Sequence, residues 1–188
     1  LRSLVGSEMC IRDRSIILGN LEGFMNMKIN KTNVMRILDQ EKTEYTPFFY
    51  EANPKLTGEE IAKILNEPVD TVFKTLICQG KSHSFYAFLI PVAKELDLKS
   101  AAKACGEKEV QMLPLKDLLP TTGYVHGGCS PIGLKKHMKH YIDDSALSYD
   151  YIFFSGGKVG AQVKLKTQDA LKVAELIPAS ISKEPDQY

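Results

Sequence analysis

The sequence predicts a single α+β domain whose mixed, mostly antiparallel and barrel-like β-sheet is flanked by short helices. Three observations support this fold class. The chain has 188 residues, which is the size of one ordinary domain. Hydrophobic residues make up 44% and charged residues 25%, as in globular proteins with a substantial core. About eight short β-prone segments alternate with short helical segments, and no repeat or linker divides them.

The first residues do not share this pattern. Residues 1–24 show neither a helical nor a strand period, and their charges are mixed where a signal peptide would have a basic start. The segment SLVGSEMCIRDR also looks like translated linker sequence. We therefore expect a non-native or disordered leader over residues 1–27, a domain over 28–180 and a frayed tail over 181–188. A genuine flexible N-terminal tail is the alternative.

The first elements of the domain are short. Residues 31–41 place apolar side chains on one face and predict an amphipathic helix. Residues 45–51 predict a strand that Pro47 interrupts. Thr57 and Glu60 have the spacing of a capping box, so a helix is expected to begin there.

A hairpin and a capped helix follow. Residues 72–78 and 84–92 predict two strands that a short turn joins. Asp97 is a favourable N-cap for a helix through residue 104, and Gly106 is suited to end it.

The second half continues the alternation. Strands are expected over residues 110–113, 123–129, 140–143, 151–155 and 161–165. Short helices are expected over residues 114–119 and from Thr167 through Ile177, with Pro178 ending the last one.

Charge and cysteine spacing exclude several classes of protein. Lys plus Arg number 24 and Asp plus Glu number 23, so any contact with nucleic acid needs a local basic patch. The cysteines at 10, 78, 105 and 129 form no Cys-x-x-Cys pair, which argues against a zinc ribbon, a redox pair or a disulfide scaffold. No apolar run approaches the length of a membrane span. We expect a cytoplasmic protein that does not contact membranes.

Familiar catalytic and cofactor patterns are also missing. Residues 156–160 lack the spacing of a phosphate loop and lie between two strands. His137 and His140 have no Glu or Cys at metal-ligand spacing, and lysines surround them. Cys129 has no fixed His partner, so a small core residue is the simpler interpretation. No cofactor and no metal are therefore expected.

Lys74 is unusual for its position. On a strand it shares a face with Val72 and Leu76, which are apolar. Either this face is exposed at a sheet edge, or the lysine points into a cleft.

Two glycine-rich turns are further candidates for ligand contact. Gly127 and Gly128 precede Cys129, Ser130 and Pro131. Residues 155–157 contain a second pair of adjacent glycines, next to a serine. Adjacent glycines let backbone N–H groups approach a ligand carbonyl or phosphate, and Ser130 adds a hydroxyl. A plain turn is the alternative at each place.

In order and spacing these segments resemble the YbaK/EbsC family of Cys-tRNA(Pro) deacylases, free-standing relatives of the editing domain of bacterial prolyl-tRNA synthetase. The resemblance runs from about residue 31 to residue 177. Its motifs are residues 72–76, 91–92, 95–99, 103–106, 122–128, 130–133, 135–136 and 155–158.

The resemblance implies the YbaK fold, with one pocket for the aminoacylated 3′ end of tRNA. It implies Lys74 as the residue most closely tied to catalysis. The other positions that it implies or that the glycine turns suggest for substrate binding are Tyr50, Thr75, Gly127, Gly128, Ser130, Ser155, Gly156 and Gln162. Gln162 stands where the best-known member has an acidic residue, so a role for a carboxylate there is in doubt.

The family mechanism is substrate-assisted: the cysteine thiol of the substrate attacks its own carbonyl and releases tRNA. Alternatives are a deacylase for another small amino acid such as alanine, and a non-catalytic module that binds aminoacyl-tRNA or a synthetase. Prolyl-tRNA synthetase is a candidate partner. The basic cluster of Lys135, Lys136 and Lys139 is the densest positive patch available for tRNA phosphates. A solvated face without a role is the alternative for this cluster.

Overall fold

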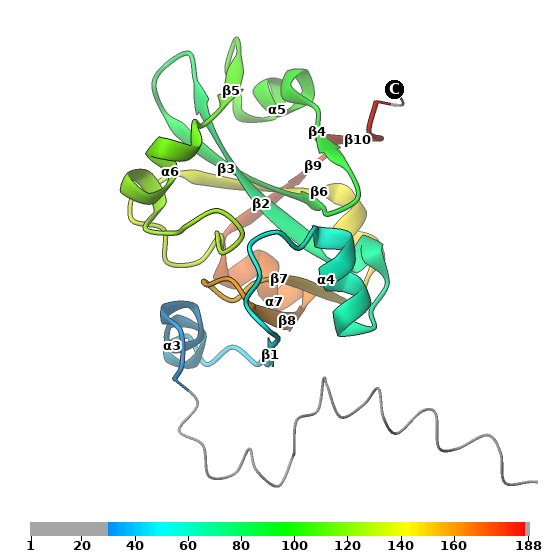
Figure 1. The fold of residues 1–188 in the computed structure, drawn as a ribbon. Coiled ribbons are helices and arrows are strands. Elements are labelled where there is room, and N and C mark those ends of the chain that lie inside the picture. Colours follow the sequence, from blue (N-terminus) through cyan, green and yellow to red (C-terminus); the bar gives the residue numbers. More distant parts are fainter. Residues whose placement is uncertain (1–29, 187–188) are drawn as a thin grey trace, which may run out of the picture. The chain divides into compact units, whose positions relative to one another are not determined.

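The computed structural model describes residues 30–186 (Figure 1). The expected leader and Cys10 lie outside the described residues. The residues from Thr32 onward cluster as one compact unit. None of the helices in the described part of the chain combines the length and hydropathy of a membrane span.

The larger sheet has five strands in the order β5-β2-β3-β6-β9. Its centre is the hairpin of β2 (Phe73–Gly80) and β3 (Phe85–Pro91), which pair antiparallel. β5 (Val110–Met112) adds to β2 antiparallel, whereas β6 (Lys139–Asp143) and β9 (Leu176–Ala179) extend the other side in parallel. The long hairpin crosses the middle of Figure 1.

A second sheet has three antiparallel strands in the order β1-β8-β7. They are β1 (Thr46–Phe49), β7 (Tyr151–Ser155) and β8 (Ala161–Lys166). A parallel bridge between Val72 and Phe153 joins this sheet to the start of β2. The predicted α+β fold with a mixed, mostly antiparallel arrangement of strands is confirmed.

Side-chain caps begin the first two helices, and the predicted capping box is confirmed, whereas Thr167 makes no cap for the last helix. Thr32 caps α3 (Asn33–Gln40) through the amide of Met35. Thr57 and Glu60 form both hydrogen bonds of the capping box at the start of α4 (Gly58–Leu65).

The caps of the third helix are confirmed as well. Asp97 accepts hydrogen bonds from two amides of α5 (Leu98–Cys105), and Gly106 ends that helix with φ +75°. The remaining helical elements are η1 (Val69–Thr71), α6 (Leu115–Thr122), η2 (Asp144–Ser148) and α7 (Thr167–Val173).

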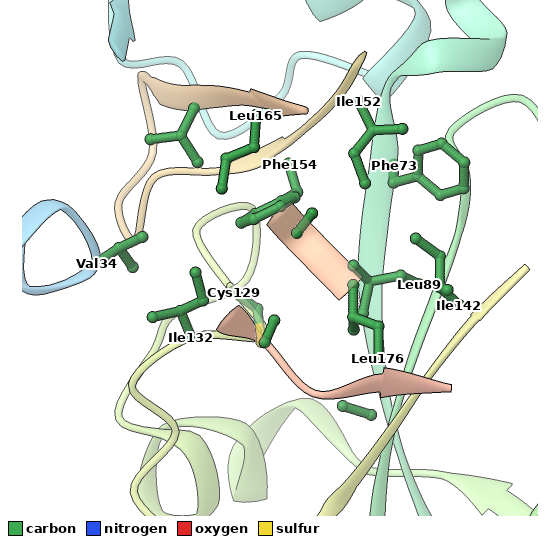
Figure 2. Packing of buried hydrophobic residues seen from close by; sticks show 14 of the residues in the cluster. Val34, Phe73, Leu89, Cys129, Ile132, Ile142, Ile152, Phe154, Leu165 and Leu176 are labelled. Atoms are coloured by element: carbon green, nitrogen blue, oxygen red, sulfur yellow. The ribbon is translucent and has the colours of Figure 1, made fainter. Parts of the chain in front are cut away.

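The main core lies between the two sheets and helices α3 and α7. Figure 2 shows Leu89 and Ile142 from the larger sheet together with Phe154 and Leu165 from the smaller one. These four side chains are at most 1% exposed. Phe73 belongs to the same cluster, so the strand that carries Lys74 is held by the core on its other face.

Three sequence predictions are wrong in detail. Residues 123–129 form a loop instead of a strand, because Gly123 and Gly127 take φ of +81° and +84°. Pro47 lies within β1 without breaking it, since β1 is an edge strand and a missing N–H is tolerated there. The last helix ends at Val173, and the residues that follow cover the edge of β6 as β9.

The expected fraying from residue 181 also needs correction. Ile181 is fully buried, and Ser182–Lys183 form β10, which pairs with β4 (Glu95–Leu96). The buried carboxylate of Asp143 accepts hydrogen bonds from the amides of Ile181 and Ser182, at 3.2 and 2.9 Å. The burial of Ile181 and these two hydrogen bonds hold residues 181–183 in place, although the polar composition of the tail suggested that it would fray.

Candidate active site

A cavity of about 410 Å³ lies where the two sheets meet. Its walls come from β2, the segment before and into α4, the loop after α6, and the ends of β7 and β8. Six of the residues singled out in the sequence line it: Lys74, Thr75, Gly127, Cys129, Ser155 and Gln162. Residues as far apart in the chain as Pro54 and Gln162 therefore contribute to one site.

Lys74 points toward this cavity, so the cleft alternative is the correct one. It is only partly exposed, and its Nζ donates a hydrogen bond to the carbonyl oxygen of Val92 at 3.2 Å. Burial lowers the pKa of Lys74, and the charges of Glu95 and Glu59 oppose that shift. Neither carboxylate lines the cavity. The ammonium group thus keeps donor capacity for an anionic or carbonyl oxygen.

The two glycine turns pack against each other. A Cβ built on Gly128 would lie 3.0 Å from backbone atoms of Lys158 and Val159, which is tighter than ordinary contact. Gly127 faces the cavity, whereas Gly128 forms the contact behind it. The glycines therefore bring the backbone of one loop close to the other, and Gly127 leaves its backbone accessible from the cavity.

Ser130 and Gly156, also expected to bind substrate, do not line the cavity. Ser130 is fully buried, and its Oγ accepts a hydrogen bond from the amide of Ile132 at 3.4 Å. The amide of Gly156 donates to the carbonyl oxygen of Ala161 at 2.8 Å. In this geometry both residues shape the loops that carry the lining residues.

Gln162 lies on β8 and is 5% exposed. Its Nε2 donates to the hydroxyl of Tyr50 at 3.4 Å, so Tyr50 supports the cavity wall without lining it. The Oε1 atom of Gln162 and the Oγ1 atom of Thr75 are buried and have no hydrogen-bond partner. Both atoms are closed to solvent, so they lie behind the surface of the cavity, where an unpaired polar atom costs free energy.

Cys129 combines two environments. It lines the cavity but also belongs to the main core cluster (Figure 2). Burial raises the pKa of its thiol to about 12, although a hydrogen bond with Thr122 acts in the other direction. A thiol that stays protonated at neutral pH is a poor nucleophile.

The other lining residues were not predicted as site residues, and Lys55, Leu118 and His126 are among them. Lys55 and His126 are exposed, and Leu118 is partly buried. His126 directly precedes Gly127, which is a signal that could have suggested it. Lys55 and Leu118 are brought there by the packing of distant segments, for which the sequence holds no local signal.

The basic cluster lies elsewhere on the surface. Lys135, Lys136 and Lys139 are exposed, and none of them lines the cavity. The Nζ of Lys136 lies 4.8 Å from the centre of the Phe85 ring. His140 is hydrogen-bonded through Nδ1 to the carbonyl oxygen of Ala174 at 2.7 Å. Within residues 30–186 no group of three or more potential metal ligands occurs.

The lining has a consistent chemical character. It contains two lysines, hydroxyl and amide groups, and accessible backbone, but no aspartate or glutamate. Such a site suits an ester or a phosphate, whose oxygens accept hydrogen bonds and whose transition states gain negative charge.

Comparisons with known proteins agree with this character. Residues 52–173 match the family described as the aminoacyl-tRNA editing domain. The chain is 42% identical over 144 residues to EbsC of Enterococcus faecalis, provisionally named a Cys-tRNA(Pro)/Cys-tRNA(Cys) deacylase, and the match covers 76% of this chain and 88% of EbsC. Over 101 residues it is 28% identical to the proline–tRNA ligase of Thermosipho africanus, covering 54% of this chain and 18% of the ligase.

A solved structure gives the same fold. A protein provisionally described as a trans-editing enzyme for prolyl-tRNA synthetase superposes with a TM-score of 0.68 at 20% identity. The superposition covers 81% of this chain and 98% of that protein.

Proposed function

The chain belongs to the aminoacyl-tRNA editing domain family, and on this premise we propose that it is a free-standing deacylase of mischarged tRNA, with Cys-tRNA(Pro) as its substrate. The observation that carries the proposal is the 42% identity to EbsC across nearly the whole of that protein. The cavity supports the proposal. Lys74 and Gly127 both line it, and its volume of about 410 Å³ is suitable for an aminoacyl group.

The chemistry follows from an ester that is already activated. The thiol of the bound cysteinyl group attacks its own carbonyl carbon; a C–S bond forms and the ester C–O bond breaks. The 3′-oxygen of tRNA leaves and takes up the proton that the thiol gave up, and water later opens the thiolactone. The protein only has to orient the ester, and orientation supplies roughly 7–11 kcal/mol in well-aligned intramolecular reactions.

Two groups can stabilise the charge that develops on the carbonyl oxygen. The Nζ of Lys74 has donor capacity beyond its bond to Val92. The backbone of Gly127 is accessible from the cavity. Such preorganised donors are worth more than the same groups in water, because they need no reorganisation when the charge develops.

Replacing Cys129 by alanine or serine is expected to keep most of the deacylation activity. The reacting thiol belongs to the substrate, and the Cys129 thiol stays protonated at neutral pH because its pKa is about 12. Steady-state rates with Cys-tRNA(Pro) measure the effect. Loss of activity together with a trapped acyl group on Cys129 in the wild type would contradict this mechanism and indicate covalent catalysis.

The proposal is tested by deacylation assays with Cys-tRNA(Pro), Ala-tRNA(Pro) and Ser-tRNA side by side. Selective cleavage of the cysteinyl ester supports it. Faster cleavage of the alanyl ester would indicate a hydrolase that uses water, and binding without cleavage of any ester would indicate a non-catalytic module.

We further propose that the protein acts in the cytoplasm on the 3′ end of aminoacyl-tRNA and associates with prolyl-tRNA synthetase. The similarity to a segment of a proline–tRNA ligase supports this association, because a domain built into one relative can act beside the enzyme in another. Co-elution with the synthetase in the presence of tRNA tests it.

Changing Lys135, Lys136 and Lys139 to glutamine is expected to weaken tRNA binding and to flatten its salt dependence. Each lost phosphate contact removes roughly 0.7–0.9 from the slope of log K against log salt. Filter binding over a range of salt concentrations measures this slope. Cleavage of a small cysteine ester should be nearly unchanged, because the three lysines lie outside the cavity. An unchanged tRNA affinity and slope would show that the cluster is only a solvated face.

A further inference from the structure

Helix α6 carries two leucines that are left exposed to solvent. Leu115 and Leu119 are 68% and 53% exposed, and they lie one turn apart on the same side of the helix. In the described part of the chain the exposed large apolar side chains are few, and three of them, Leu115, Leu119 and Val125, fall within residues 115–125. Single exposed apolar residues are common, whereas a cluster of them indicates a contact surface.

The leucine side of α6 adjoins the wall of the cavity. Leu118, Thr121 and Thr122 form the inner face of this helix, and Leu118 also lines the cavity. Leu115 is three residues before Leu118 and four before Leu119, so it is a neighbour of both on the helix surface. An apolar strip therefore runs around α6 from the cavity to the solvent.

The exposed lining residues mark the mouth through which a bound tRNA has to leave the cavity. On one side they belong to the segment before α4, and on the other to His126 and Gly127 in the loop after α6. The first turn of α4 carries Glu59 and Glu60, which repel phosphates. The loop after α6 leads back to the leucines instead, and this side offers a path without such repulsion (Figure 1).

The charges on the α6 side suit a nucleic acid. Lys116 is exposed, whereas Asp117, the carboxylate of this helix, lines a separate hollow beside β5. At the end of α6 the amide of Lys135 donates to the carbonyl oxygen of Thr122 at 3.0 Å, so the basic cluster begins where the helix ends. A ligand that runs from the cavity along α6 meets apolar groups and then cations.

We infer that Leu115 and Leu119 bind the unpaired 3′ bases of tRNA between the cavity and the basic cluster. This inference rests on the proposed deacylase function and adds a surface outside the cavity. Unpaired bases present apolar faces that a base-paired stem hides, and the phosphates that link them suit the neighbouring lysines. Because the leucines carry no charge, the affinity that they contribute does not depend on salt through counter-ion release.

The test compares intact tRNA(Pro) with the same tRNA shortened by its unpaired 3′ nucleotides. The double variant Leu115→Gln, Leu119→Gln of the full chain should bind the intact tRNA roughly 5- to 20-fold more weakly than the wild type does. It should bind the shortened tRNA as tightly as the wild type, with the same slope of log K against log salt. The unchanged slope distinguishes the leucines from Lys135, Lys136 and Lys139.

Leu147 offers a matched control, because it is 51% exposed on η2 and does not line the cavity. Leu147→Gln should leave the binding of both tRNAs unchanged. Filter binding over a range of salt concentrations measures the affinities, and melting curves show that each variant is folded.

Three results would overturn the inference. Equal affinity of the double variant and the wild type for intact tRNA shows that the bases do not lie on α6, and an equal loss for both tRNAs shows that the contact is not with the unpaired end. Unchanged tRNA binding together with lost co-elution with prolyl-tRNA synthetase, or with a loss of self-association in sedimentation, assigns the surface to a protein contact. If the wild type cleaves Cys-tRNA(Pro) in these cases, only the inference falls; if the wild type cleaves no ester, the proposed function falls whatever the leucines do.

Discussion

Replacing Lys74 by alanine is expected to lower kcat/KM for Cys-tRNA(Pro) deacylation by about 10²–10³-fold, the usual effect of removing one preorganised donor from a developing oxyanion. The protein should remain folded, because the side chain is only partly buried and makes one hydrogen bond to a backbone carbonyl. Single-turnover rates and a melting curve measure both effects.

Lys55 offers a matched control for this experiment. It is the other lysine of the cavity lining, but it is exposed. Lys55→Ala should reduce the rate only a few-fold. Turnover near the wild-type rate in a folded Lys74→Ala protein would rule out the catalytic assignment.

The pH profile gives an independent check on Lys74. Its pKa is lowered, mainly by burial, so the ammonium form is lost at a lower pH than in an exposed lysine. The alkaline decline of kcat/KM should therefore begin early in the wild type. In Lys74→Arg any remaining activity should persist to higher pH, because a guanidinium group stays charged.

Deleting residues 181–188 is expected to lower the free energy of unfolding by about 3–5 kcal/mol. The deletion removes the fully buried side chain of Ile181 and leaves the carboxylate of Asp143 without two of its donors. For a chain of this length the midpoint of thermal unfolding should fall by about 6–20 °C.

Deleting only residues 184–188 is the control. It keeps Ile181 and the β10–β4 pairing and removes two surface ion pairs, Lys94–Glu184 and Lys183–Asp186, so the free energy of unfolding should change far less than in the longer deletion. Equal stability of the two truncated proteins would contradict the structural role assigned to residues 181–183.

Asp143 makes the effect dependent on pH. Burial raises the pKa of this carboxyl, but hydrogen bonds from Ser145, Ser182 and Ile181 outweigh burial and hold it below its usual value. A lowered pKa in the folded state contributes stability above the unfolded value of about 3.9. That contribution is lost as the pH falls through the folded pKa, and it should shrink in the longer deletion.

Local signals in the sequence account for much of the fold. The capping box at Thr57 and the cap at Asp97 are made by neighbouring residues, so short-range spacing is sufficient to predict them. β9, β4 and β10 were missed because each exists only through a partner far away in the chain. Ile177 and Pro178 fit the end of a helix equally well until the edge of β6 is in place.

For the site, too, local features could be predicted from the sequence, whereas contacts between distant segments could not. Lys74 shares its strand face with apolar residues, and this pattern correctly predicted a cleft. Gly128 allows a close approach to the backbone of Lys158 and Val159, whereas the approach of the glycine amides to a ligand stays a prediction. The sequence contained no indication that Lys55 and Leu118 reach the same cavity. Nor could it show that the amide of Gln162 is left with a free oxygen, since that depends on where Tyr50 lies.

The bridge between Val72 and Phe153 joins two sheets that contribute different residues to the site. Lys74 and Thr75 follow the bridge on the larger sheet, whereas Ser155 and Gln162 belong to the smaller one. Side chains on β7 and β8 can thus be exchanged while the lysine keeps its support in the larger sheet. Substitutions on the smaller sheet can therefore change the specificity for the aminoacyl group, while the larger sheet keeps Lys74 in place for the reaction. The junction of the two sheets is thus where specificity can evolve independently of catalysis.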